Sequence, residues 1–419
     1  MKFLIKSATG LPHLSKNIVK EIKKMMDLYI NEDKCCGCEA CCNVCPRQAI
    51  TMKENRRGFV YPSIDEEKCI NCGLCKSVCI YQNEVPKTSP LAAFAAATKS
   101  KELIKKTASG GFFSVCAEKI LRQGGVVYGA AFTSECHVRH IRVDAIGELW
   151  KLQGSKYVQS EIGNSYKLAK NDLQQGKTVL FSGTPCQIAG LKNYLKKEYD
   201  NLYTIDLICH GVPSQKMFLD YVATLSSEKI EDFVFRDKTR GWKDFFLTWK
   251  EKNKRKRLHN KMSSYYRLFL TGEIYRESCY SCHFACMTRV SDITLGDFWG
   301  FEKVHPEKLN EKKWRDQNWR GISCVLANTN KGMQLFNGVK LELYAFESSP
   351  DKIAVSNGQL KEPSKHTAIR EQVLDSYEKN GYRAVDQLMM KKISKKQCIK
   401  SKIQILVPLE LRIRIKNSK

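Results

Sequence analysis

The stretch Cys35–Pro46, CCGCEACCNVCP, decides the fold of the N-terminal part of this chain. Its cysteines follow the spacing C-x2-C-x2-C-x3-C, and a proline follows the fourth cysteine. The same spacing recurs in Cys69–Cys79, CINCGLCKSVC, where Ile80 takes the place of the proline. In bacterial ferredoxins, three cysteines of such a run bind one 4Fe–4S cluster and the fourth ligates the neighbouring cluster. The doubled run therefore predicts a small domain with two 4Fe–4S clusters.

The crossed ligation pattern assigns each cysteine of the two runs to a cluster. The first cluster is expected on Cys35, Cys38, Cys41 and Cys79, and the second on Cys69, Cys72, Cys75 and Cys45. Structural zinc binds four thiolates as two separated pairs, and two copies of a four-cysteine run argue against it. Cys36 and Cys42 are left over, and we expect them to serve in packing.

Length and composition limit the class of protein to which the whole chain can belong. The 419 residues are too many for one compact core, and 42% hydrophobic with 27% charged residues excludes a disordered chain. The longest apolar run, Leu91–Ala97, is too short to span a membrane, and Phe3–Ile5 is too short for a signal peptide. Since no export signal is recognisable, we expect a cytoplasmic protein. In that reducing compartment, nineteen cysteines indicate metal sites rather than disulfides.

The positive charge is concentrated in two segments. The chain carries 70 basic and 44 acidic residues, a net charge of +26, of which +6 lies in 250–261 and +9 in 391–419. Two local patches do not form a nucleic-acid groove, so nucleic acid is not expected as a partner. The basic surface favours an acidic redox partner such as a ferredoxin or flavodoxin. Apolar and charged residues alternate in Leu409–Lys416, which predicts an edge-paired or mobile tail. Binding of this basic tail to an anionic membrane surface is the lesser alternative.

Four segments follow from these patterns. Residues 1–32 are expected to form an N-terminal helix, 33–85 the two-cluster domain, 91–345 an α/β domain, and 346–419 a helical and basic extension. In the third segment, buried strands alternate with helices, which predicts parallel strands joined by crossovers. Its expected strands are 92–98, 126–132, 138–143, 179–182, 202–207, 292–295 and 324–327. A hairpin is expected in 232–262, with the basic segment 250–257 as its turn.

Four further cysteines are candidates for a third metal site. Cys186 and Cys209 each follow a predicted strand, at the sheet edge where ligands bind in open α/β folds. Cys279 and Cys282 form a C-x2-C pair in an irregular loop, with Cys286 as a possible substitute. From spacing alone, four ligands and four unrelated structural cysteines are equally supported.

Nucleotide-binding signals are mostly negative. The sequence has no GxGxxG and no GxxxxGK[ST], so a Rossmann site and a P-loop are not supported. Ser109-Gly110-Gly111 opens a predicted helix and offers backbone N–H groups to a phosphate. Gly154-Ser155-Lys156-Tyr157 adds a cation and a hydroxyl. No catalytic residue can be named, because no histidine has a carboxylate or serine partner at a recognisable spacing.

With these blocks in order, the chain resembles the coenzyme F420 (deazaflavin) hydrogenase/dehydrogenase beta-subunit family, in the version with an N-terminal two-cluster domain. The matching blocks are Ser109–Gly111, Gly154–Tyr157, Gly183-Thr184-Pro185-Cys186-Gln187, Cys209-His210-Gly211, Cys279-x2-Cys282 and Asp292–Phe298. The resemblance implies a non-Rossmann α/β domain that binds FAD, with Ser109–Gly111, Gly154–Tyr157, Gly183 and Thr184 as candidate cofactor contacts. It also implies a third 4Fe–4S cluster on Cys186, Cys209, Cys279 and Cys282.

The resemblance further implies an oxidoreductase that passes electrons between a two-electron hydride carrier and one-electron clusters. A flavin is needed between them because a hydride carries two electrons and each cluster accepts one. The expected partners are a hydride-carrying cosubstrate and an acidic redox protein or an oxidoreductase subunit. The alternative is a non-enzymatic iron–sulfur subunit that only connects a larger redox complex.

Overall fold

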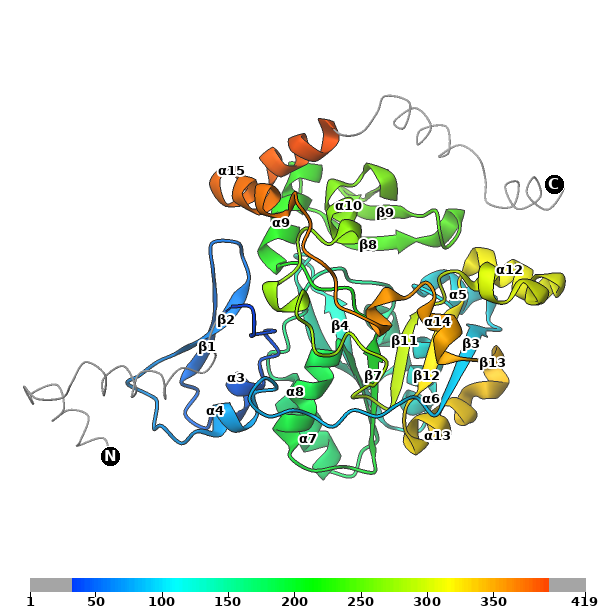
Figure 1. Cartoon of the computed structure of the whole chain (residues 1–419), viewed down its shortest axis with the longest axis horizontal. Coiled ribbons are helices and arrows are strands. Elements are labelled where there is room, and N and C mark those ends of the chain that lie inside the picture. Colours follow the sequence, from blue (N-terminus) through cyan, green and yellow to red (C-terminus); the bar gives the residue numbers. More distant parts are fainter. Residues whose placement is uncertain (1–31, 392–419) are drawn as a thin grey trace, which may run out of the picture.

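The computed structural model describes residues 32–391, and Figure 1 shows their arrangement. The helix expected within residues 1–31 and the strand-like tail expected in 409–416 lie outside the described residues. Within the described range, no helix combines the length and the apolar character needed to cross a bilayer.

The N-terminal module consists of short elements around the cysteine runs. These are α3 (Ala40–Val44), β1 (Ile50–Glu54), β2 (Val60–Ile64) and α4 (Leu74–Ser77), with β1 and β2 paired antiparallel. α3 and α4 each begin after a left-handed residue, Glu39 at φ 60° and Gly73 at φ 72°. Ala40, Val78, Ile80 and Val85 of the module pack into a core that they share with the larger domain.

An eight-stranded mixed sheet organises the larger domain, in the order β13-β3-β12-β11-β7-β6-β4-β5. Its strands are β3 (Ala92–Thr98), β4 (Val126–Phe132), β5 (Val138–Val143), β6 (Val179–Gly183), β7 (Leu202–Leu207), β11 (Ile293–Asp297), β12 (Ser323–Ala327) and β13 (Leu343–Ser348). β4, β6, β7 and β11 run parallel, and every other pairing in the sheet is antiparallel. The parallel strands therefore end at one common edge.

Helices cover both faces of this sheet (Figure 1). The helices of the larger domain are α5 (Lys101–Lys106), α6 (Phe112–Arg122), α7 (Ser165–Gln174), α8 (Pro185–Leu195), α9 (Gln215–Leu225), α10 (Ser264–Thr271), α11 (Phe301–Val304), α12 (Lys312–Arg320), α13 (Asn330–Val339), α14 (Pro350–Ala354) and α15 (Arg370–Lys391). Short 3₁₀ turns are η1 (Ile146–Leu152), η2 (Lys238–Arg240), η3 (Asn260–Met262), η4 (Glu277–Cys279), η5 (Pro306–Asn310), η6 (Lys340–Glu342) and η7 (Gly358–Leu360). α6 and α13 share a core on one face, and α7 and α8 share a core on the other.

The predicted alternation of strands and helices is largely present, and it forms a mixed sheet rather than a parallel one. β3, β4, β5 and β7 have the predicted bounds. The extension expected to be helical, 346–419, contains α15, which is interrupted at Gly381 with φ 71°. The chain is thus an α+β protein with a parallel segment at the centre of its sheet.

The second sheet differs from the prediction. β8 (Glu231–Asp237), β9 (Phe246–Glu251) and β10 (Lys254–His259) form three antiparallel strands, and the turn is only Lys252–Asn253. The prediction that the basic segment 250–257 is the turn was wrong. Most of that segment is strand, and β10 is an edge strand on which exposed cations are tolerated and oppose edge-to-edge pairing.

Candidate functional site

The first cysteine run folds around a cavity of about 290 Å³. Its lining includes Cys35, Cys38 and Cys41 of the first run and Cys79 of the second. Burial, together with the nearby thiols of Cys38 and Cys79, raises the pKa of Cys35 to about 11 against an opposing effect of Arg276. The structure thus brings the last cysteine of the second run to the first three cysteines of the first run.

The second run is more open. Cys72 is the only exposed cysteine among the residues the structure describes. Burial raises the pKa of Cys75, and the nearby thiols of Cys69 and Cys72 add to this effect. These three side chains are therefore close neighbours. The Cys45 sulfur accepts a hydrogen bond from the Ala49 backbone N–H at 3.3 Å.

The four later cysteines meet at the carboxyl edge of the parallel strands. Cys186 is the second residue of α8, directly after β6, and Cys209 follows β7 by two residues. η4 ends on Cys279, and Cys282 lies in the loop that follows. These four side chains and that of Cys36 line a cavity of about 30 Å³, whose lining does not include Cys286.

The donor set of this cavity fits an iron–sulfur cluster. Burial raises the pKa of Cys279 to about 12 and that of Cys282 to about 11, and each is raised further by neighbouring thiols. Burial and the other three thiols also raise the pKa of Cys209 well above its usual value. Buried thiols whose ionisation is opposed in this way are stabilised as thiolates when they ligate a metal.

Among the described residues, no group of three or more His, Cys, Asp or Glu side chains converges on one ion position. In a 4Fe–4S cluster each thiolate ligates a different iron atom, so the four sulfur atoms stand apart. Cys186 differs from its neighbours, because a hydrogen bond from the Cys36 thiol lowers its pKa to about 7.

The Ser109–Gly111 block, a candidate flavin contact, is held by the protein itself. The Ser109 hydroxyl donates to the Ile322 carbonyl at 2.9 Å, and the Gly110 N–H donates to the Ser323 hydroxyl at 3.0 Å. A Cβ at Gly110 would overlap the Ala96 carbonyl oxygen. The glycine is therefore required by close packing between neighbouring segments, whether or not a phosphate binds there.

The other candidate flavin contacts lie near the same sheet edge. Lys156 is directed at its own loop, since its ammonium donates to the carbonyls of Gln153 at 2.8 Å and Lys151 at 3.1 Å. Burial lowers the pKa of Lys156 to about 7. The Tyr157 ring packs 4.5 Å from the Phe269 ring, centroid to centroid. Thr184 caps α8, and its N–H donates to the Gln187 side chain at 3.0 Å.

Two basic residues beside this edge were missed in the sequence. Lys238, at the end of β8, donates to the Ser109 carbonyl at 2.8 Å. Arg236 pairs with Asp297 at 2.6 Å, where β11 ends. Burial lowers the pKa of Lys238 to about 7. Neither residue lies in a recognisable sequence motif. The only motif that pointed to this place is the Asp292–Phe298 block, which contains Asp297, the partner of Arg236.

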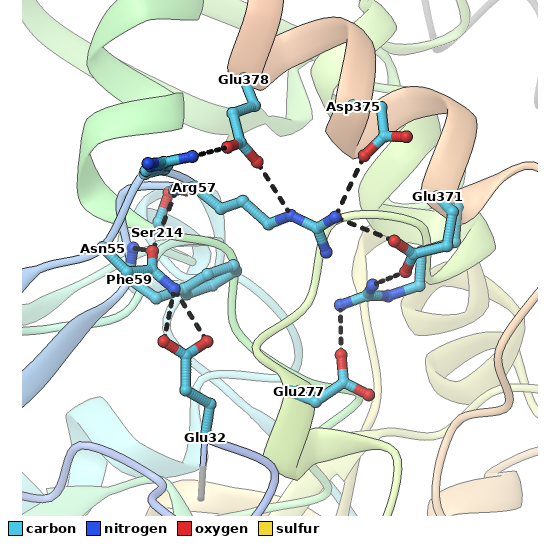
Figure 2. Close-up of polar contacts among 11 residues, drawn as sticks. Glu32, Asn55, Arg57, Phe59, Ser214, Glu277, Glu371, Asp375 and Glu378 are labelled. Atoms are coloured by element: carbon cyan, nitrogen blue, oxygen red, sulfur yellow. Dashed lines mark hydrogen bonds and ion pairs between the residues drawn. The ribbon is translucent and has the colours of Figure 1, made fainter.

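Polar contacts attach the N-terminal module to the larger domain, and three groups of them are described in turn. In the Arg57 cluster (Figure 2), Arg57 pairs with Glu371 at 2.9 Å, Asp375 at 3.2 Å and Glu378 at 3.6 Å on α15. The second group is the Glu39 carboxylate, which accepts from the Ile162 and Gly163 N–H groups, both at 2.9 Å.

The third attachment is Arg276. Its Nη1 donates to the Cys35 carbonyl at 2.9 Å, and its Nε donates to Gln159 at 3.0 Å. None of the residues that make these attachments had been singled out in the sequence, because hydrogen-bonding residues at a domain interface follow no spacing rule.

Comparison with known proteins finds two segments of the chain that match known families. Residues 176–352 match the family of the C-terminal part of the coenzyme F420 hydrogenase/dehydrogenase beta subunit, and residues 34–83 match the 4Fe-4S dicluster domain. One chain of the F420-reducing [NiFe] hydrogenase complex from Methanosarcina barkeri is similar at 15% identity and a TM-score of 0.41, over 73% of this chain and 90% of that chain. No curated protein matches. The resemblance seen in the sequence is confirmed, and the chain is a redox protein with an iron–sulfur domain.

Proposed function

We propose that this chain, which joins a 4Fe–4S dicluster domain to a coenzyme F420 hydrogenase/dehydrogenase beta-subunit domain, is an iron–sulfur flavoprotein oxidoreductase. It would pass electrons between a deazaflavin-like hydride carrier and its 4Fe–4S clusters. FAD bound at the carboxyl edge of the sheet would supply the conversion between two-electron and one-electron transfer. The observation that carries the proposal is the meeting of Cys186, Cys209, Cys279 and Cys282 in one cavity.

The ligand assignment is part of the proposal. Each ferredoxin-type cluster takes three cysteines from one run and the fourth from the other, and the third cluster takes the four sheet-edge cysteines. Cys36 and Tyr81 line both cavities, so the first ferredoxin site and the sheet-edge site are neighbours. The exposure of Cys72 supports the second ferredoxin site as the point where electrons reach a partner.

The partner is either an acidic redox protein or an oxidoreductase subunit. The matched family is named for a beta subunit, which favours assembly with other subunits. The net charge of +26 favours an acidic surface on whichever protein binds.

Anaerobic reconstitution tests the function. The protein is loaded with iron and sulfide in the presence of FAD, desalted, and assayed for all three. Three clusters predict about twelve iron atoms and one FAD per chain. Saturation near eight iron atoms would remove the third cluster, and clusters without flavin would reject the flavoenzyme.

The second candidate is a non-enzymatic iron–sulfur subunit that connects a larger redox complex. It is favoured by the internal packing of Gly110 and by the use of the Lys156 ammonium by its own loop. Full cluster loading without bound FAD would support it.

A further inference from the structure

Arg276 is a buried cation without a carboxylate partner. Its side chain is 0% exposed, and it lies three residues before Cys279, whose N–H donates to the Arg276 carbonyl at 3.0 Å. Among residues 32–391, no aspartate or glutamate pairs with it, whereas the equally buried Arg370 pairs with Glu277 at 2.9 Å and Arg289 with Asp206 at 3.2 Å. An uncompensated buried charge costs several kcal/mol, so its position needs an explanation.

Neutral groups of the N-terminal module surround the guanidinium. Besides Gln159 and the Cys35 carbonyl, it donates to the Val60 carbonyl. It stacks 4.4 Å from the Tyr61 ring centroid and 5.6 Å from that of Phe59. These contacts fix where the guanidinium lies, but they supply no negative charge.

Gln159 extends the same contact to the first cysteine run. Its amide accepts from Arg276 and donates to the carbonyls of Cys36 at 3.0 Å and Gly37 at 3.2 Å. A Cβ at Gly37 would lie 2.6 Å from the Gln159 amide nitrogen and 2.8 Å from Arg276 Nη2. The glycine permits this approach, so the run is held directly against the arginine.

Arg276 contacts the backbone of both cysteine groups. Its guanidinium donates to the Cys35 carbonyl of the first ferredoxin site at 2.9 Å, and its own carbonyl accepts from the N–H of Cys279 in the sheet-edge site at 3.0 Å. Four thiolates give an oxidised 4Fe–4S cluster a charge of about −2. With both sites loaded, the buried cation has anionic groups on two sides.

We propose that Arg276 is a positioning residue that acts as the shared counter-charge of two cluster sites, one in the N-terminal module and one at the sheet edge. This inference rests on the proposed function, because it requires both sites to hold clusters. A positive charge favours the more negative, reduced state of a cluster. Arg276 therefore raises the reduction potential of both neighbouring clusters and leaves that of the second ferredoxin cluster unchanged.

The test is a redox titration of the reconstituted full chain, followed by electron paramagnetic resonance. Arg276→Gln keeps hydrogen-bonding capacity but removes the charge. At a fixed potential, we expect the ratio of reduced to oxidised cluster to fall about tenfold at the two neighbouring sites, a shift of about 59 mV for a one-electron couple. Arg276→Lys, which keeps the charge, should stay within about threefold of wild type.

Two controls separate charge from structure. Arg370→Gln removes an equally buried arginine that has its own carboxylate partner, and we expect no selective shift. Gln159→Glu places a carboxylate beside the retained Arg276, so it should lower the reduction potentials of the same two clusters. If Arg276→Gln does not fold, the Gln159→Glu variant tests the inference in its place.

The outcomes distinguish this inference from the proposed function. Wild-type protein that does not bind the third cluster refutes the function. If wild-type protein binds three clusters, the variants test the inference. An unchanged ratio of reduced to oxidised cluster at both sites in loaded Arg276→Gln or Gln159→Glu protein, or an equal shift at all three sites, refutes it.

Discussion

The two groups of cysteines in this chain are built in opposite ways. In the N-terminal runs, Cys35, Cys38 and Cys41 are neighbours in sequence, and they line a cavity of about 290 Å³. In the sheet-edge group, 93 positions separate Cys186 from Cys279, and the shared cavity is about 30 Å³. The first group is arranged by local spacing in a module with little core of its own. The second group exists only when β6, β7 and the 279–282 loop are assembled.

This difference predicts different dependence on folding. A loop that wraps a cluster gains much of its order from the metal, as in other small metal-stabilised domains. The sheet-edge thiols are instead placed by α8, by the chain after β7 and by the loop after η4, so their arrangement depends on the packed core of the larger domain.

The largest expected effect comes from breaking the sheet-edge group. Cys209→Ser removes one of its four ligands, and we expect the iron content after reconstitution to fall by about four atoms per chain. The ferredoxin-type clusters should remain, as measured by iron assay and electron paramagnetic resonance. Cys286→Ser is the matched control, because Cys286 does not line the cavity. Equal iron in Cys209→Ser and wild type would contradict the assignment.

A second substitution tests the crossing between the two runs. Cys79 belongs to the second run but lines the cavity of the first. Cys79→Ser should therefore weaken the cluster on Cys35, Cys38 and Cys41 and preserve the more exposed one. Potential-resolved electron paramagnetic resonance identifies the lost signal by comparison with Cys38→Ser. If Cys79→Ser instead reproduces the spectrum of Cys69→Ser, the crossed ligation is wrong.

Each of the two N-terminal cysteine runs contains one glycine, and the two glycines have different surroundings. Gly37 and Gly73 have similar left-handed backbones, at φ 65° and φ 72°. A Cβ at Gly37 meets Gln159 and Arg276, while a Cβ at Gly73 meets nothing within 4 Å. Gly73→Ala should cost only the backbone strain, about 1 kcal/mol, and Gly37→Ala about 2–4 kcal/mol because the overlap adds to it. Denaturant unfolding of the loaded protein measures both, and equal losses would show that the approach of Arg276 is unimportant.

The smallest effect is expected at the Arg57 cluster, which attaches the N-terminal module to α15. Its carboxylates are partly exposed, with Glu371 at 60% and Asp375 at 52%. Exposed ion pairs contribute little, so Arg57→Ala should lower the unfolding free energy by about 1 kcal/mol at low salt and less in 1 M salt. Lys68→Ala is the control, since its pair with Asp65 lies within the module. A loss that does not depend on salt would point to packing instead.

Much of the fold could be predicted, because buried strands and amphipathic helices leave a local pattern. The strands 92–98, 126–132 and 202–207 have the predicted bounds. The pattern says nothing about strand direction, so the antiparallel neighbours β12, β3 and β13 were not foreseen. The basic segment was assigned to a turn because hydrophilic residues are common in turns, whereas β10 is an exposed edge strand.

The amino-acid sequence alone was enough to identify the dicluster module and the resemblance of the later part of the chain to the coenzyme F420 hydrogenase/dehydrogenase beta subunit, because ligand spacing is local and the matching blocks keep their order. Only the tertiary structure decided that Cys186, Cys209, Cys279 and Cys282 share a cavity and that Gly110 is required by packing. It also brought Arg276 into backbone contact with Cys35 of one cysteine group and Cys279 of the other. The physical reason is that electrostatic and packing interactions depend on distance in space, and a spacing rule reports only distance along the chain.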